Sequence, residues 1–501
     1  MRVRYRVPAA DQEVRRRLDA VLDRVLDDAL EAALVRRGVP VGEEICLRAV
    51  RAPVRLRLDA GETGAADTWS AAIADAIAAA VSSGGTDVAR YRSRHVALAE
   101  LALGVADGRL ERVWAWRQLG IWRGPDAPDA RGRASELALA LASEPAGIVA
   151  VLTHVARAGA LPPLLRLLSP AEWLELAHAA LAVAGASAGI VDGTLQRGLA
   201  PRDAAVPSAL PEVTPVPSPV AVAVAEHVVR TSSISRAAGG VEPLSTDTAA
   251  ALAALAWLEA DPGAVGAAPT GRAVEVVAHL ARELSQEIRR AEAPDDRLPA
   301  RVSTEMEARA GAEPAGPAVG EEPSAEAGEA TEVVAARAVT DYGGLLFLLG
   351  LLDELDIPGD ACRTAPLARR PLRWTLHRLA LTLAPLAPDD PAALAFAGLP
   401  PDAEPPGYDE RPQTDAELAA LGETRARIEE RLAEQLAQAD VPTDELLDFV
   451  CRRRAEIVFD PGWLEVHLPL DEVSVELRRA AIDLDPGWLP WLGVVVRFVY
   501  G

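Results

Sequence analysis

The chain has 501 residues, of which 50% are apolar but only 4% aromatic, and a formal net charge of −23 at pH 7. This length allows more than one domain, and an apolar fraction so poor in aromatic residues favours packed helices over a β-sandwich. The negative charge argues against binding to nucleic acid or to an anionic membrane surface, because phosphate groups would be repelled. All 51 basic residues are arginine, a bias typical of GC-rich codon usage.

The cysteine spacing, the N-terminal residues and the length of the apolar runs predict a cytoplasmic protein. Cys46, Cys362 and Cys451 are far apart and odd in number, so neither a disulfide framework nor a zinc knuckle is indicated. Residues 1–7 lack the apolar core of a signal peptide. The longest strongly apolar run, at 343–352, is too short to span a bilayer. We therefore expect no membrane insertion.

Residues 1–84 are predicted to form a small α+β domain. Apolar residues alternate over 3–7, which is the period of a half-buried strand. An amphipathic helix is predicted at 14–33, with Gly38 at the position of a C-cap. The remaining predicted elements are a strand at 45–58, interrupted by Pro53, and a helix at 68–81.

Residues 85–200 have helical periodicity, with glycines and tryptophans where helices are expected to cross. Ser169 and Glu172 match a capping box, with Pro170 at the first helical position, and predict the start of a helix. A second helical region is predicted at 220–292.

Two segments interrupt these helical regions. Residues 201–219 are rich in proline and are predicted to be a connector. Residues 293–332 consist largely of Ala, Glu, Gly and Pro. Such a segment buries too little apolar surface to offset the entropy lost on ordering. We therefore predict a disordered acidic linker between two folded parts.

Helices are expected to resume at about Val333 and to form residues 333–454. Thr414, followed by Glu417, signals the start of one of these helices. Thr443 marks the start of the last predicted helix.

Residues 455–501 are predicted to form a strand-containing C-terminal cap. The phrase Asp-Pro-Gly-Trp-Leu occurs twice, at 460–464 and at 485–489. Asp-Pro-Gly is typical of turns, so each copy predicts a turn, a tryptophan anchor and a strand. In the final strand, alternate residues are expected to form one apolar face: Val494, Val496, Phe498 and Tyr500.

Tryptophans beside turns and a glycine pair at the head of an apolar helix suit packing, either within the chain or against a partner. Both readings stay open. The candidate interaction residues are Trp463, Trp488, Trp491, Tyr342, Gly343 and Gly344.

Four segments, in their order along the chain, resemble the tape measure proteins of contractile injection systems, the phage-tail-like particles of bacteria. The segments are Arg-Leu-Arg-Leu-Asp at 55–59 after the N-terminal helix, Thr-Asp-Tyr-Gly-Gly-Leu-Leu-Phe-Leu-Leu at 340–349, Asp-Pro-Ala-Ala-Leu-Ala-Phe-Ala-Gly-Leu-Pro at 390–400, and the close Leu-Pro-Trp-Leu-Gly-Val-Val-Val-Arg-Phe at 489–498.

This resemblance implies a non-enzymatic component that occupies the inner tube or baseplate hub and helps to set tube length. It further implies inner-tube, baseplate and spike-hub proteins as partners, self-association, and assembly in the cytoplasm. The runner-up is a baseplate or tube adaptor of the same particle.

An enzymatic alternative rests on Gly185-Ala186-Ser187-Ala188-Gly189, which matches the nucleophile elbow of serine hydrolases. The elbow requires a preceding strand, whereas a helix is predicted before Ser187. Residues 61–64 lack the Lys-Ser/Thr end of a phosphate loop and are interpreted as a turn, and no two histidines have helical zinc spacing. The arginine runs at 15–17 and 452–454 are expected to be solvated helix faces. We therefore predict no catalytic, cofactor-binding or metal-ligating residues.

Overall fold

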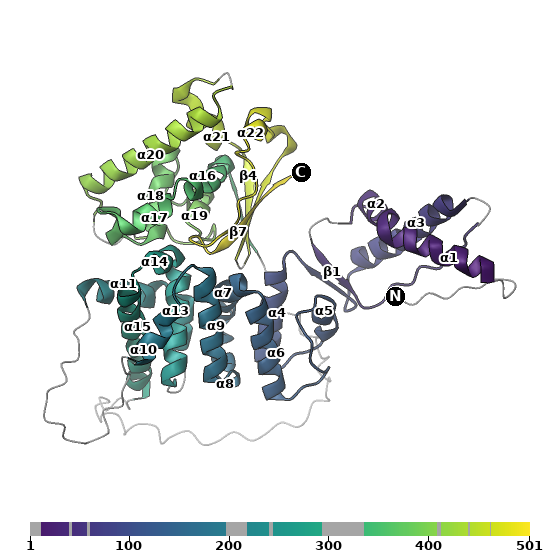
Figure 1. Cartoon of the computed structure of the whole chain (residues 1–501), viewed down its shortest axis with the longest axis horizontal. Coiled ribbons are helices and arrows are strands. Elements are labelled where there is room, and N and C mark those ends of the chain that lie inside the picture. The colour runs from purple at the N-terminus through teal and green to yellow at the C-terminus, as the bar shows by residue number, and fades with distance from the viewer. Residues whose placement is uncertain are drawn as a thin grey trace, which may run out of the picture.

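The computed structural model describes residues 12–39, 43–57, 61–196, 218–239, 244–292, 335–407, 412–438, 441–460 and 462–501. Within them the protein is mainly α-helical and multidomain, with small sheets, which confirms the predicted fold class. Figure 1 shows N-terminal helices, a helical unit and a C-terminal unit that contains a sheet. Outside the described residues lie the strand predicted at 3–7, the linker predicted at 293–332, and all but the last two residues of the connector predicted at 201–219.

The N-terminal helices pack around a small apolar cluster of their own that includes Val21 and Trp69. They are α1 (Gln12–Arg24), the π-helix η1 (Val25–Ala29), α2 (Leu30–Arg36) and α3 (Gly61–Ser83). The helix predicted at 14–33 is confirmed, and Gly38 follows it with a φ of +67°. Because α3 begins at Gly61, the interpretation of residues 61–64 as a turn is wrong.

The strand predicted at 45–58 is only partly present. The structure pairs β1 (Glu44–Leu47) antiparallel with β2 (Val88–Tyr91). Residues 51–57 form no strand, so the second half of the prediction is wrong. Val54 and Leu56 are instead half-buried against the N-terminal helices. The period of two reflects alternate side chains packing on a helical surface, without a partner strand.

The helical unit, shown in blue to teal in Figure 1, is built around α13, which is buried from Thr248 to Ala260. Its alanines allow α9 and α15 to pack closely against it. The helices predicted at 220–292 and the capping box of Ser169 and Glu172 are confirmed. The elements are α4 (Arg94–Asp107), α5 (Val113–Gln118), α6 (Ala130–Ser143), the 3-10 helix η3 (Pro145–Gly147), α7 (Ile148–Arg157), α8 (Leu161–Leu167), α9 (Pro170–Val183), α10 (Gly189–Gln196), α11 (Pro219–Thr231), α12 (Ser233–Ala238), α13 (Thr246–Ala260), α14 (Pro262–Ala267) and α15 (Thr270–Glu292).

The C-terminal unit packs helices against a sheet whose strand order is β3-β4-β5-β7-β6. The pairing of β5 with β7 is parallel and the other pairings are antiparallel. The strands are β3 (Ala336–Thr340), β4 (Ala455–Asp460), β5 (Trp463–Leu468), β6 (Gly487–Leu489) and β7 (Val494–Tyr500). The helices are η4 (Gly343–Phe347), α16 (Leu348–Glu354), α17 (Ile357–Arg363), η5 (Leu367–Arg369), α18 (Leu372–Leu383), α19 (Pro391–Phe396), α20 (Asp415–Gln435), η6 (Thr443–Glu445), α21 (Leu446–Cys451), η7 (Leu470–Glu472) and α22 (Val475–Arg479).

Two predictions for this unit are wrong. The chain resumes at 336–340 as strand β3 rather than as a helix, because β4 offers it an antiparallel partner from far along the sequence. The helix predicted from Thr443 is present as η6 and α21, but it is followed by α22 and is not the last. The capping box at Thr414 and Glu417 is confirmed at the start of α20.

The apolar face of the last strand is confirmed, and the glycines of both Asp-Pro-Gly phrases have positive φ. A turn is present at Gly462, but none is present at 485–487, where Gly487 already begins β6. Gly462 and Gly487 have φ values of +68° and +74°, which suit glycine, and each precedes or begins a strand. In β7, Val494, Val496 and Phe498 are buried while their neighbours are half-buried. Tyr500, at the end of the same face, is half-buried against it.

Candidate functional site between the helical unit and the C-terminal unit

Asp261, which follows α13, joins the two units. Its Oδ1 accepts a hydrogen bond from the backbone N–H of Ala264 at 3.0 Å, and its Oδ2 accepts one from Leu372 at 2.6 Å. The carboxylate therefore caps α14 in one unit and meets the first residue of α18 in the other. Burial raises the pKa of Asp261, although these N–H donors favour its charged form.

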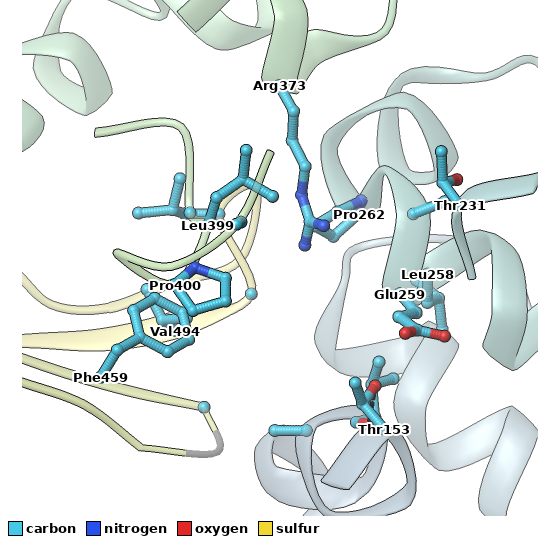
Figure 2. Close-up of a pocket in the computed structure, with 18 of the residues that line it drawn as sticks. Thr153, Thr231, Leu258, Glu259, Pro262, Arg373, Leu399, Pro400, Phe459 and Val494 are labelled. Atoms are coloured by element: carbon cyan, nitrogen blue, oxygen red, sulfur yellow. Dashed lines mark hydrogen bonds between the residues drawn. The ribbon is translucent and has the colours of Figure 1, made fainter. Parts of the chain in front are cut away.

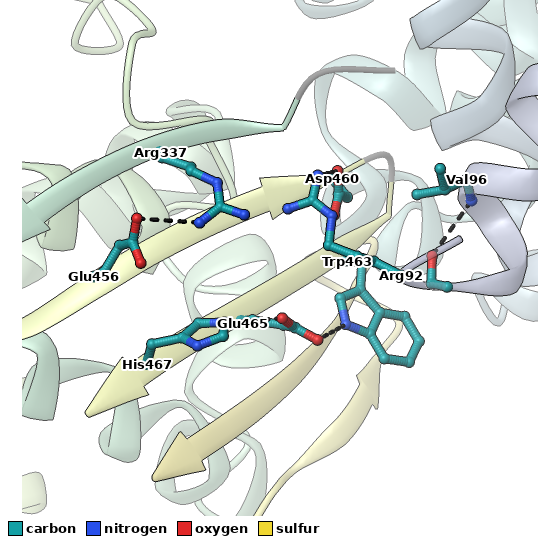
Figure 3. A network of polar contacts seen from close by, with 9 residues as sticks. Arg92, Val96, Arg337, Glu456, Asp460, Trp463, Glu465 and His467 are labelled. Atoms are coloured by element: carbon teal, nitrogen blue, oxygen red, sulfur yellow. Dashed lines mark hydrogen bonds and ion pairs between the residues drawn. The ribbon is translucent and has the colours of Figure 1, made fainter. Parts of the chain in front are cut away.

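A second junction lies at the turn between β4 and β5 (Figure 3). The Nη2 atom of Arg92 contacts Oδ1 of Asp460 at 3.0 Å, and the Asp460 side chain is only 1% exposed. Burial raises the pKa of Asp460 to about 6, which Arg92 partly opposes. Beside this pair, the rings of His95 and Trp463 meet edge to face, with centroids 6.2 Å apart.

A cavity of about 770 Å³ lies between these junctions and is lined by both units. Figure 2 shows Arg373 reaching from α18 into the space between Leu399 of the C-terminal unit and Pro262 of the helical unit. Phe459 and Pro400 form part of one wall. The opposite wall comes mainly from α7, α11 and α13.

The cavity lining holds as many arginines as carboxylates, although the protein as a whole is acidic. Basic side chains come from both units: His154, Arg157, His227, Arg230, Arg236 and Arg373. The acidic residues are Glu259, Asp402, Glu404 and Asp460, of which Asp402 and Glu404 are exposed. Burial and the neighbouring Arg157 lower the pKa of His154, which favours the neutral ring. The arginines therefore carry most of the positive charge.

The three tryptophans singled out by the sequence are all half-buried. Trp463 lies at the junction just described, and its Nε1 donates to Glu465 at 3.1 Å. The Nε1 atom of Trp491 donates to Asp353 at 2.7 Å. Trp488 lines the cavity, and its buried Nε1 has no hydrogen-bond partner among the described residues. Each ring thus packs within the chain while part of its surface stays accessible.

Gly343 and Gly344 are buried, whereas Tyr342 is half-buried. A Cβ on Gly344 would lie 2.1 Å from the carbonyl oxygen of Val450, and one on Gly343 would lie 2.3 Å from Cβ of Ala455. The glycine pair thus permits η4 to pack directly on α21 and β4. The glycine pair lies within the C-terminal unit and does not line the cavity, which both units form.

Three of the four family-like segments lie against one another in the C-terminal unit. Oγ1 of Thr340, in the first, donates to Oδ1 of Asp390, in the second, at 2.9 Å. Gly398 of the second packs so closely on Leu492 of the third that an added Cβ would lie 2.9 Å from its Cδ1. The fourth segment, at 55–59, falls in the N-terminal part and is described only as far as residue 57.

The nucleophile elbow is absent at Ser187. Residues 184–188 connect helix α9 to helix α10, as expected, and Oγ of Ser187 accepts a hydrogen bond from the backbone of Gly189 at 3.2 Å. The three cysteines are free thiols. Burial raises the pKa of Cys46 to about 11 and those of Cys362 and Cys451 to about 12, so the thiolate form is disfavoured.

The interpretation of 452–454 as a solvated helix face is wrong. These residues follow α21, and Arg453 is buried, donating to the carbonyl oxygens of Glu472 at 2.8 Å and Phe449 at 3.0 Å.

Among the described residues, no group of three or more His, Cys, Asp or Glu side chains could hold a metal ion. In the same part of the chain no single helix is long and apolar enough to cross a membrane, and only the bent pair of α6 with η3–α7 passes that test jointly.

Of the residues that line the cavity, sequence reasoning singled out Trp488 but missed the arginines. Arg157 and Arg373 lie in different units, and neither belongs to a motif with characteristic spacing. The same holds for Arg92, whereas Asp261 begins an Asp-Pro-Gly phrase and is the N-cap of α14, a local signal that sequence reasoning did not single out. No protein-family model, curated protein or solved structure matches the chain.

Proposed function

We propose that the chain is a non-enzymatic assembly component of a bacterial contractile injection system, similar to its tape measure protein. One observation carries the proposal: three family-like segments, distant in sequence, pack against one another through the Thr340–Asp390 and Gly398–Leu492 contacts. All three phrases are thus part of one hydrophobic core in the C-terminal unit. Their proximity supports a shared module, and its partners would be inner-tube, baseplate and spike-hub proteins.

A baseplate or tube adaptor of the same particle is the second candidate. The longest described helices, α3 and α15, have 23 residues each, or about 35 Å at 1.5 Å per residue. The helical and C-terminal units are also docked on each other through Asp261 and Leu372. A ruler needs an extended chain, whereas an adaptor needs a folded body with surfaces for its neighbours. This geometry favours the adaptor where the two candidates differ.

Deletion of the gene, followed by electron microscopy of particles, tests both candidates. Loss of a ruler should give tubes of irregular length, and loss of an adaptor should give particles without a joined baseplate. Complementation with a chain lengthened between 293 and 332 separates them further, because tube length should follow chain length only for a ruler. Normal particles in normal numbers after deletion would refute both.

The non-enzymatic part of the proposal has its own test. A fluorophosphonate probe should leave Ser187 unlabelled, because the residue lies between two helices and has no elbow geometry. The matched control is Ser187→Ala, which should give the same background labelling as the parent chain. Labelling that disappears in the variant would instead support the hydrolase alternative.

A further inference from the structure

We infer that the cavity between the helical unit and the C-terminal unit binds a small molecule that carries a phosphate group, held by Arg373 and Arg157. This inference goes beyond the particle role, since it concerns a ligand of the isolated chain.

The first step concerns the guanidinium of Arg373. The described residues provide it with no hydrogen bond and no ion pair, and its Nε is buried without a partner. Figure 2 shows the side chain extending into the space between the two units. A buried guanidinium normally has hydrogen-bond acceptors, because desolvating its charge is costly. An anion from solution would satisfy this group.

The second step concerns the carboxylates that could have neutralised it. Glu259 accepts hydrogen bonds from the backbone of Ser233 at 2.9 Å and of Ile234 at 3.0 Å, and from the hydroxyl of Ser232 at 2.5 Å. The Glu259 carboxylate therefore accepts hydrogen bonds from the first N–H groups of α12. Asp261 is likewise occupied by its two backbone donors. These acids lie near Arg373 and favour its charge, but their described hydrogen bonds go to backbone N–H groups and a serine hydroxyl and none goes to Arg373.

The third step concerns the charge that the ligand would bring. Arg157, at the end of α7, lines the same cavity and is close enough to disfavour the charge on Arg373. Its only described hydrogen bond runs from Nε to Oγ of Ser233 at 3.4 Å, which leaves the outer nitrogens available. Two guanidinium groups facing one space repel each other, and a dianion neutralises both. Phosphate suits this arrangement because its oxygens accept forked pairs of N–H donors.

The fourth step concerns the rest of the ligand. Much of the wall on the C-terminal side is apolar and partly aromatic, with Phe459 and Pro400 labelled in Figure 2, although Asp402, Glu404 and Asp460 of that side also line the cavity. Trp488 lines the same cavity. A ligand with an apolar or aromatic body would cover this wall while its phosphate meets the arginines. Inorganic phosphate would contact the arginines but leave the apolar wall uncovered.

Calorimetric titration of the full chain tests the inference, with phenyl phosphate, inorganic phosphate and benzoate as probes. Phenyl phosphate should bind more tightly than either of the others. Arg373→Gln and Arg157→Gln should each weaken its binding by on the order of 10- to 100-fold, the usual worth of a charge-assisted hydrogen bond. Arg373→Lys should bind with intermediate affinity, since it keeps the charge but not the fork.

The matched control is Arg272→Gln, an exposed arginine on α15 outside the cavity lining, which should leave affinity unchanged. Arg157 is exposed, so its variant is expected to fold even if Arg373→Gln does not. Three results would overturn the inference: no binding of phenyl phosphate, equal binding by the parent and the Arg157 variant, or equal affinity for benzoate.

Discussion

Oδ2 of Asp261 accepts a 2.6 Å hydrogen bond from the backbone N–H of Leu372, across a junction between two units of the fold. The same carboxylate caps α14 through Ala264. A single side chain thus serves two helix starts that are far apart in the sequence.

Replacing Asp261 by alanine should destabilise the protein by about 2–4 kcal/mol, since both N–H groups lose their acceptor in a buried place. Asp261→Asn keeps one acceptor oxygen in nearly the same shape and should cost less. Urea unfolding followed by circular dichroism measures the difference. Equal midpoints for the alanine variant and the parent would show that the junction contributes nothing.

Gly344→Ala should destabilise the C-terminal unit by more than about 2 kcal/mol, because the new Cβ would collide with the backbone of α21. Gly422 offers a matched control on the exposed surface of α20, where an added Cβ meets nothing within 4 Å. Gly422→Ala should stabilise by about 0.5–1 kcal/mol through helix propensity. Thermal melting of both variants gives the comparison, and similar shifts would contradict the packing argument.

Glu417 and Arg370 form a buried ion pair with N–O distances of 2.8 and 3.1 Å. Glu417→Gln should cost about 3 kcal/mol because it leaves the buried guanidinium without its counter-charge. Glu429→Gln, which breaks a partly exposed pair with Arg425 on the same helix, should cost about 0.5 kcal/mol or less. Urea midpoints of the two variants provide the measurement. A smaller loss at Glu417 than at Glu429 would contradict this account.

The same pair predicts a dependence on acid. Arg370 lowers the pKa of Glu417 to about 2. A depressed carboxyl pKa contributes stability above its unfolded value, and that contribution is lost as the pH falls from about 4 toward 2. The difference in unfolding free energy between the parent and Glu417→Gln should therefore shrink over this range. A difference that stays constant would show that the charge of Glu417 is not responsible.

For Asp460 we expect the opposite dependence of stability on pH. Burial raises its pKa to about 6, so the folded state favours the protonated acid. That contribution to stability is present below about pH 4 and is lost as the pH rises through about 6. Asp460→Asn should therefore gain stability relative to the parent as the pH rises from about 4 to about 7, by roughly 1.4 kcal/mol per unit of pKa shift.

Urea midpoints of both chains across this pH range check the Asp460 prediction. Asp402→Asn, on an exposed loop of the same unit, is the control and should show no such trend. A parent chain that becomes relatively more stable at higher pH would mean that the contact with Arg92 outweighs the cost of burial.

Local sequence signals predicted much of the fold because the interactions that produce them are local. The capping boxes at Ser169 and Thr414 join residues three positions apart, and each begins the predicted helix. The alternation of Val494, Val496 and Phe498 predicted the buried face of β7 because neighbouring side chains of a strand point to opposite sides. The glycines at 462 and 487 have the expected positive φ.

Tertiary structure alone decided the elements and sites that depend on distant partners. Residues 336–340 form a strand because β4 lies beside them, whereas 51–57 alternate without a partner and form none. Arg453 is predicted from the sequence to be one of three surface arginines. In the structure it is buried and donates to the carbonyl oxygens of Glu472 and Phe449. The cavity of Arg157 and Arg373 exists only where two units dock. Such contacts cannot be predicted from the sequence alone, because the local spacing of these residues does not indicate which side chains meet after folding.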